Sequence, residues 1–199
     1  EVEGREILEG DADELGAERA QAFYRKLGFD ESPHIELRER GRPLWPQSWG
    51  RLTTMTVAYG HGIAVSPLHL ASAYAAVVNG GIWRPATLMK VQPGRQAKGR
   101  RIISERTSMI MRKMFRLVVT EGTGKNADVP GFRIGGKTGT AEKDGVGGYS
   151  KTKNVSTFAA AFPMDAPRYV VIAMLDSPKG SATSFGQTTA AYTAAPVVA

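Results

Sequence analysis

Apolar side chains recur at helical spacing in three stretches of the first two thirds of the chain. The first stretch predicts a helix from Asp13 to Leu27 that is stopped by Gly28. The second predicts a helix that opens at Ser66-Pro67, where serine can cap and proline suits the first turn, and that ends at Asn79-Gly80-Gly81. The third predicts a helix that begins at Ser104. The apolar face of this third helix is expected to comprise Ile110, Met111, Met114 and Leu117.

Strand-like patterns dominate the last third of the chain. They predict strands over Phe132–Ala141, Val155–Phe162 and Tyr169–Leu175, and a further strand is expected earlier, over Ala86–Val91. Only six residues, Pro163–Arg168, join the last two strands, which is too short for a crossover helix, so these strands should pair antiparallel. Helices followed by a meander indicate an α+β fold, an antiparallel β-sheet flanked by helices.

Composition limits the class of protein. With 199 residues, 42% hydrophobic and 23% charged, the chain can bury one core, and residues 32–50 form a loop in which prolines and two tryptophans pack together. No apolar run approaches the roughly 20 residues of a membrane helix. A membrane anchor of the parent protein is therefore expected to lie outside this sequence. Because there is no cysteine, disulfides, thiol catalysis and cysteine-bound metals are excluded.

The net charge of +7 raises the question of an anionic partner. The densest basic stretch, Arg95–Arg101, contains no aromatic residue that could stack on bases, so we expect a solvated loop and no nucleic-acid binding. Three histidines, His34, His61 and His69, have no second ligand at a zinc-like spacing. We therefore predict no metal site and no cofactor.

The stretch from Gly131 to Thr138 formally matches the phosphate-loop pattern of nucleotide-binding proteins. A phosphate loop needs a buried strand before its first glycine and a helix that starts at its Lys-Thr pair. Pro130 interrupts the approach, and Gly139 follows Thr138 directly. The antiparallel pairing also denies the parallel sheet on which such loops lie, so we expect no nucleotide site here.

The same residues fit an exposed strand edge better. An edge strand offers unpaired backbone amides to a peptide-like substrate, and a glycine in it permits close approach. Lys137 supplies a cation, and the hydroxyls of Thr138 and Thr140 can bind a carboxylate. This pattern predicts a substrate-binding strand from Lys137 to Thr140.

Three blocks carry a family resemblance. Lys137-Thr138-Gly139-Thr140-Ala141-Glu142-Lys143 is similar to the Lys-Thr-Gly signature of penicillin-binding proteins and serine β-lactamases. The stretch from Tyr59 to Ala71, continued by Asn79-Gly80-Gly81, resembles a block of division-type class B penicillin-binding proteins, and so do Asp176–Lys179 and Ala194–Val198. The resemblance identifies residues 1–199 as an incomplete transpeptidase domain of the penicillin-binding-protein and serine β-lactamase-like fold.

This resemblance implies the chemistry of a serine-type D,D-transpeptidase. A serine in a Ser-x-x-Lys motif forms an acyl-enzyme with a D-Ala-D-Ala stem peptide, and a Ser-x-Asn motif assists proton transfer. By resemblance Lys137 and Thr140 are catalytic residues, and Thr138, Gly139 and Thr140 bind the donor carboxylate or a β-lactam. From their positions, His61 and Tyr149 are candidates for lining the cleft.

The nucleophile is missing from this sequence. The one formal Ser-x-x-Lys, Ser150-Lys151-Thr152-Lys153, follows a glycine-rich turn and is expected to be a solvated loop, not the start of a buried helix. No Ser-x-Asn occurs. The family pattern indicates a joint near Asp11 and Ala12 that skips the Ser-x-Asn segment, which was either deleted or disordered. We expect this polypeptide by itself to be inactive.

The resemblance also implies a setting for the parent protein. It is expected to cross-link peptidoglycan, with a septal role in cell division, at the periplasmic side of the cytoplasmic membrane, and to be inhibited by β-lactams. Divisome proteins are the expected partners, and a role in elongation or cell shape is the alternative assignment. Two other functions stay open: a serine β-lactamase or D,D-carboxypeptidase, and a non-catalytic binding or scaffold domain.

Overall fold

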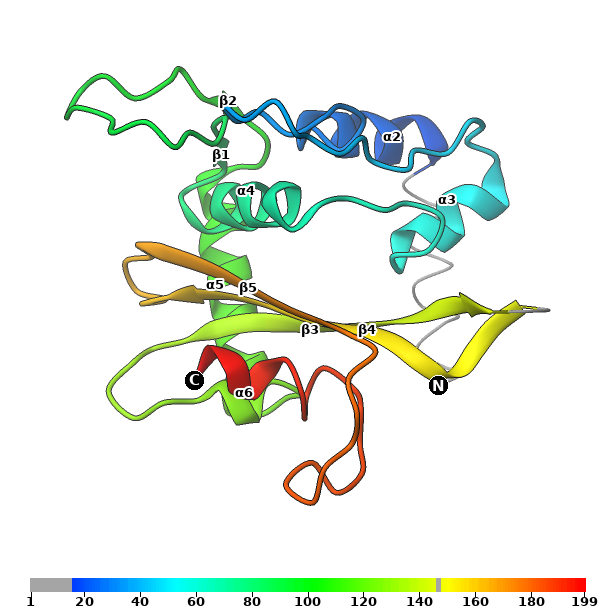
Figure 1. The fold of residues 1–199 in the computed structure, drawn as a ribbon. Helices are drawn as coiled ribbons and strands as arrows, with labels where there is room; N and C mark the ends of the chain where they lie inside the picture. The colour runs from blue at the N-terminus through cyan, green and yellow to red at the C-terminus, as the bar shows by residue number, and fades with distance from the viewer. Residues whose placement is uncertain (1–15, 146–147) are drawn as a thin grey trace. The chain divides into compact units, whose positions relative to one another are not determined.

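The computed structural model describes residues 16–145 and 148–199 (Figure 1). The helices are α2 (Ala17–Lys26), α3 (Arg51–Ala58), α4 (Pro67–Val78), α5 (Glu105–Thr120), the 3₁₀ helix η1 (Lys125–Ala127) and α6 (Ala195–Val198). The strands are β1 (Ile82–Trp83), β2 (Arg100–Arg101), β3 (Gly135–Gly145), β4 (Gly148–Phe162) and β5 (Tyr169–Asp176). The chain forms two compact units. The first unit comprises residues up to Ser72 with Arg84–Ile102, and the second comprises Ala73–Trp83 with Ile103–Ala199.

Aromatic packing organises the first unit. The Tyr24 ring stacks on Phe29 at a centroid distance of 5.9 Å and lies 6.1 Å from Trp49, whose own ring is 5.0 Å from that of Trp45. The loop that carries the two tryptophans is tied by a backbone bridge between Leu44 and Ala64. The prediction of an irregular segment held by aromatic contacts is therefore confirmed.

The helices of the first unit match the predictions unevenly. Helix α2 begins at Ala17, four residues later than predicted from Asp13, because Gly16 has a positive φ of 77° that a helix cannot include. The predicted joint near Asp11 and Ala12 lies outside the described residues. Helix α3 was not predicted: four of its eight residues, three threonines and a valine, are β-branched, which lowers helix propensity. Helix α4 opens at Pro67 and ends at Val78, as predicted.

The strand expected over Ala86–Val91 is wrong. This segment has no strand partner. The backbone N–H of Leu88 donates to the Glu36 carboxylate at 2.9 Å, and the Thr87 hydroxyl donates to the other oxygen of the same carboxylate. The side chains of Leu88 and Met89 are both exposed, so no apolar face exists to hold a strand against a core. The basic stretch that follows is an exposed loop up to its last two residues, which form β2.

The second unit contains a three-stranded antiparallel sheet in the order β3-β4-β5, which confirms the predicted pairing and the α+β class. Strand β4 lies between its neighbours, and its four residues from Phe158 to Ala161 are at most 2% exposed. One face of the sheet packs on a cluster that includes Ala194 and Ala195, next to helix α6 (Figure 1). The other face packs on Phe115 and Met164. A strand buried on both faces reads as continuously apolar, as this one does.

Helix α5 follows its predicted start but not its predicted face. Ser104 caps the helix by accepting the backbone N–H of Thr107 at 3.0 Å, which confirms the start. The buried side chains are Ser108, Phe115 and Val119. Of the residues expected to form the apolar face, only Met111 packs against the core, whereas Ile110, Met114 and Leu117 are exposed.

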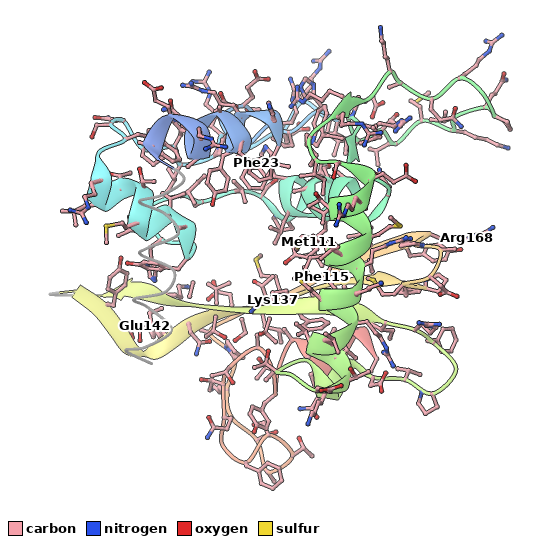
Figure 2. All side chains as sticks on the ribbon, turned by 180° about the vertical axis from the view of Figure 1, so that it is seen from behind. Phe23, Met111, Phe115, Lys137, Glu142 and Arg168 are labelled. Carbon is pink, nitrogen blue, oxygen red and sulfur yellow. The ribbon has the colours of Figure 1, made fainter. Side chains whose placement is uncertain are left out.

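The rotation of α5 is set by the contacts of its buried side chains, among them a hydrogen bond from the Ser108 hydroxyl to the Val77 carbonyl and one aromatic contact. Phe115 stacks on Tyr74 with ring centroids 5.4 Å apart, and both rings are largely buried. Burial raises the pKa of the Tyr74 hydroxyl to about 12. Met111 and Phe115 extend from the same side of the helix in Figure 2. Periodicity alone could not distinguish this face from the adjacent methionine-rich one.

Strand β3 begins three residues later than predicted. Phe132 lies in a turn after Gly131, whose φ is 86°, and the backbone N–H of Phe132 donates to Val129. Its ring is 58% exposed, so the predicted start of the strand at Phe132 is wrong. Ile134 is buried in the core, and the extended strand follows from Gly135.

Candidate active site

The residues from Lys137 to Thr140 lie within β3, on a strand that has only β4 as a neighbour among the described residues. Lys137, Gly139 and Thr140 are exposed, and Thr138 is half-buried. Figure 2 shows Lys137 and Glu142 following one another along this strand. The backbone here is extended, with no helix starting at Lys137, so the phosphate-loop interpretation is excluded by geometry. An extended, exposed edge can accept a peptide as an added strand.

Lys137 and Lys143 belong to the same strand but have different surroundings. The Lys137 ammonium donates to the carbonyl of the adjacent Thr138 at 2.9 Å. The Lys143 ammonium is instead held by both carboxylate oxygens of Asp176 on β5, at 2.7 and 2.9 Å. This hydrogen bond from Lys143, helped by one from Ser177, lowers the pKa of the Asp176 carboxyl. Of these two lysines, Lys137 is therefore the one that can bind a ligand without breaking an ion pair.

The hydroxyls of Thr138 and Thr140 are both anchored. The Thr138 hydroxyl lies 2.8 Å from that of Thr123, which follows the end of α5. The Thr140 hydroxyl accepts the backbone N–H of Ala190 at 3.0 Å. Because a hydroxyl has one proton and two acceptor sites, Thr140 can still donate its proton to a ligand. Both side chains therefore have a defined orientation before a ligand binds.

Gly139 keeps the strand between these threonines open. A Cβ atom built at Gly139 would approach nothing closer than the Thr157 carbonyl at 3.9 Å. At Gly136 a Cβ atom would lie 2.3 Å from the Ala159 carbonyl oxygen. The strand thus changes from closely packed to open within three residues.

A segment near the C-terminal end supports the site from behind. Besides the Ala190 contact, the Thr188 carbonyl accepts the buried Ser156 hydroxyl at 2.6 Å, and the Thr188 hydroxyl accepts from the Asn154 amide at 2.9 Å. Sequence reasoning missed Thr123 and this segment, because each acts through a contact between residues distant in the chain. Only coordinates could identify them.

Ser150 and Lys153 lie at the start of β4, so the predicted loop is wrong, because the β3-β4 hairpin continues to this point. The backbone N–H of Lys153 donates to the Ser150 hydroxyl at 3.1 Å. The segment does not open a helix, which agrees with the rejection of this Ser-x-x-Lys match. A strand directs residues three apart to opposite faces, unlike the shared helical face that the motif requires.

The predicted cleft-lining roles of His61 and Tyr149 stay predictions. Tyr149 is an exposed residue of β4 opposite Asp144, and His61 belongs to the first unit, where its ring lies 5.4 Å from that of Tyr59. The buried His69 ring lies 2.9 Å from the Ser66 hydroxyl and 2.9 Å from the Glu31 carbonyl, a structural arrangement. Within the described residues there is no group of three or more potential metal ligands.

Comparison with curated proteins gives a consistent picture. The sequence profile of the penicillin binding protein transpeptidase domain matches residues 9–199. The chain is 44% identical over 194 residues to the probable peptidoglycan D,D-transpeptidase FtsI of Caulobacter vibrioides, covering 93% of the chain and 33% of that protein. It is 36% identical over 189 residues to stage V sporulation protein D of Bacillus subtilis, covering 89% and 29%. The chain thus spans about a third of the length of these relatives.

Solved structures agree. The apo TP domain of Burkholderia pseudomallei penicillin-binding protein 3 superposes with a TM-score of 0.86 at 31% identity, covering 96% of the chain and 57% of that structure. Penicillin-binding protein 3 of Mycobacterium tuberculosis, complexed with ampicillin, gives 0.81 at 30% identity, covering 92% and 44%. In each of these two superpositions, the matched region covers nearly all of the chain. The chain therefore belongs to the penicillin-binding protein transpeptidase domain family.

Proposed function

We propose that the protein carrying this chain is a serine-type D,D-transpeptidase that cross-links peptidoglycan stem peptides ending in D-Ala-D-Ala. The observation that carries the proposal is the extended, exposed stretch from Lys137 to Thr140, with its oriented hydroxyls, in a member of this family. Relatives named peptidoglycan D,D-transpeptidase support the same activity. The reaction uses no cofactor.

Each residue of the stretch has a proposed role. The Lys137 ammonium provides positive charge beside the nucleophile, and the Thr138 and Thr140 hydroxyls donate to the donor carboxylate. The Thr140 backbone N–H is proposed as half of the oxyanion hole, where loss of one donor typically costs about 3 kcal/mol of barrier. Gly139 allows the substrate strand to approach the backbone closely.

The nucleophile and its partners are proposed to belong to the rest of the parent protein. The sequence contains neither a Ser-x-Asn motif nor a Ser-x-x-Lys motif that opens a helix in the described part of the chain. None of the described helices is long and apolar enough to cross a membrane. We propose that the serine and the Ser-x-Asn motif belong to the part of the parent protein outside this chain.

The same relatives support a proposal for the setting of the parent protein. We place it at the periplasmic side of the cytoplasmic membrane, acting in septal peptidoglycan synthesis with divisome proteins. β-Lactams would occupy the donor position, and the Mycobacterium tuberculosis relative was solved in complex with one, ampicillin. His61 and Tyr149 are proposed to line the substrate cleft.

The deciding experiment is acylation of the parent protein by a fluorescent penicillin, measured as a second-order rate constant. The Lys137→Ala variant should acylate roughly a hundredfold more slowly or worse, because the charge beside the nucleophile is lost. Lys143→Ala is the matched control, since it removes an ammonium from the same strand that is paired with Asp176. This control should acylate at nearly the normal rate.

The outcomes separate the competing functions. A full-length protein that is never labelled would favour a non-catalytic scaffold and overturn the proposal. Labelling followed by deacylation within minutes would favour a β-lactamase or D,D-carboxypeptidase. Normal acylation of Lys137→Ala would remove Lys137 from the mechanism. The present chain by itself should stay unlabelled, including at Ser150.

A further inference from the structure

A groove runs along one side of α5 in the second unit, with no residue in common with the stretch from Lys137 to Thr140. Its floor is apolar and formed by Met109 and Leu117 of the helix and by Met164, and its volume is ≈ 500 Å³. Met109 and Leu117 are 45% and 53% exposed. They lie eight positions apart in the helix, which places them about 12 Å apart along its axis. We call this site the α5 groove.

The rim of the α5 groove is strongly basic. Arg112, Lys113, Arg116 and Arg133 line it, against the single carboxylate of Asp165. Arg116 is neutralised by Asp128, at 2.8 Å. Lys113 and Arg133 form no ion pair with any residue that the structure describes, and both are exposed. Two unpaired cations therefore flank two exposed apolar side chains.

Arg112 has donors to spare. Its Nη1 donates to the Asp165 carbonyl at 3.2 Å, and no other hydrogen bond of its guanidinium is recorded within the described residues. A guanidinium carries five N–H donors and binds carboxylates in pairs of parallel hydrogen bonds. A second cavity of ≈ 380 Å³ shares Met109 and Arg112 with the groove and is also lined by Glu105 and by Arg168, a residue of the β4-β5 turn that is labelled in Figure 2.

We propose that the α5 groove binds an acidic segment of a partner protein, one that carries two apolar side chains about 12 Å apart. Charge complementarity selects the partner: a carboxylate-rich segment neutralises Lys113, Arg133 and Arg112, while its apolar side chains cover Met109 and Leu117. In an extended segment, residues four apart lie on one side at about 13 Å, which matches the two anchors. This inference does not depend on the proposed catalytic activity.

A designed peptide tests the proposal on the full-length protein. The probe is a fluorescein-labelled peptide of glutamates with two leucines separated by three residues, and its binding is followed by fluorescence anisotropy. A second peptide with glutamine in place of glutamate tests charge, and a third without leucines tests the anchors. The first peptide should bind most tightly, and its affinity should fall as salt screens the charges.

Charge reversal then locates the binding site. The double variant Lys113→Glu, Arg133→Glu should bind the acidic peptide roughly five- to tenfold more weakly, because two attractive rim charges become repulsive. Lys125→Glu is the matched control, an exposed lysine of η1 that does not line the groove. It should bind almost normally. Penicillin acylation should be unchanged in all three proteins, which separates this test from that of the catalytic site.

Other results overturn the proposal. Equal affinity for the glutamate and glutamine peptides, or an equal loss in Lys125→Glu, would show only a diffuse charge effect. No binding by the unmodified protein would mean that another part of the same protein covers the groove. Sedimentation velocity could instead reveal a dimer that the Leu117→Glu substitution abolishes. That result would show that a second copy of the protein occupies the α5 groove.

Discussion

Strand β3 is packed tightly before Lys137 and is open to its surroundings just after it. At Gly135 and Gly136 the strand is closed in: added Cβ atoms would lie 2.7 Å from Met164 and 2.3 Å from the Ala159 carbonyl. At Gly139 the corresponding atom would meet nothing within 3.8 Å. Packing thus requires a glycine at position 136 but not at position 139, three positions further along the same strand.

This difference shows how a strand can be held firmly at one end while its other end stays accessible to a ligand. The packed end fixes the position and register of the strand against β4, so the open end needs no contacts on its outer side to stay in place. The side chains there are oriented from behind, by Thr123 and Ala190. A preorganised site on a regular element is more precise than one on a mobile loop.

The largest effect should come from Gly136→Ala. The new methyl group must displace the Ala159 backbone or the Phe158 ring, so we expect a loss of about 2–3 kcal/mol in the free energy of unfolding, measured by urea denaturation. Gly139→Ala is the control, and its free energy of unfolding should change by less than about 1 kcal/mol. If the two variants lose similar stability, the contrast between the ends of the strand is wrong.

A medium effect is expected for Ser156→Ala, behind the open end. The Ser156 hydroxyl is fully buried and donates to the Thr188 carbonyl at 2.6 Å, so its removal leaves that acceptor with only the longer hydrogen bond, 3.4 Å, from the Thr193 hydroxyl. The expected cost is about 1–2 kcal/mol in the free energy of unfolding. Hydrogen exchange of the Ala190 amide should also accelerate, because the segment is less firmly attached. Unchanged exchange would show that Ser156 does not hold this segment.

The smallest effect concerns Asp176, whose carboxyl pKa is lowered chiefly by the hydrogen bond from Lys143. A carboxyl whose pKa is lowered in the folded state stabilises the fold at pH values above its ordinary pKa. This contribution is lost as the pH falls through the lowered pKa. Lys143→Ala should therefore raise the Asp176 pKa toward its ordinary value and flatten the stability profile below about pH 4. Carbon-detected NMR titration of the carboxyl measures this shift, and an identical pKa in both proteins would contradict it.

The sequence predicted those features that depend on neighbouring residues. The cap at Ser104, the break at Asn79-Gly80-Gly81 and the turn at 163–168 follow from local chemistry, and all are confirmed. The face of α5 was mispredicted because two adjacent apolar faces exist, and the contact of Phe115 with Tyr74 selects one. The strand predicted at Ala86–Val91 does not form, because the backbone N–H of Leu88 donates to the Glu36 carboxylate and not to a neighbouring strand.

The candidate site divides in the same way. Lys137, Thr138, Gly139 and Thr140 were identifiable because their order in the sequence is itself a motif, and the structure places them together on one exposed strand. Thr123 and Ala190 lie 15 and 50 residues from their hydrogen-bond partners. No local pattern encodes a contact across such separations.

The bond from the Ala190 amide to the Thr140 hydroxyl has a consequence for inhibitor chemistry. Since the Ala190 amide already occupies one of the two acceptor sites of this oxygen, the hydroxyl offers a ligand its proton and only one further acceptor site. Compounds that place a carboxylate, sulfonate or boronate oxygen opposite Thr140 should therefore gain affinity. An amine or amide N–H directed to the same point would face a competing donor and should be disfavoured.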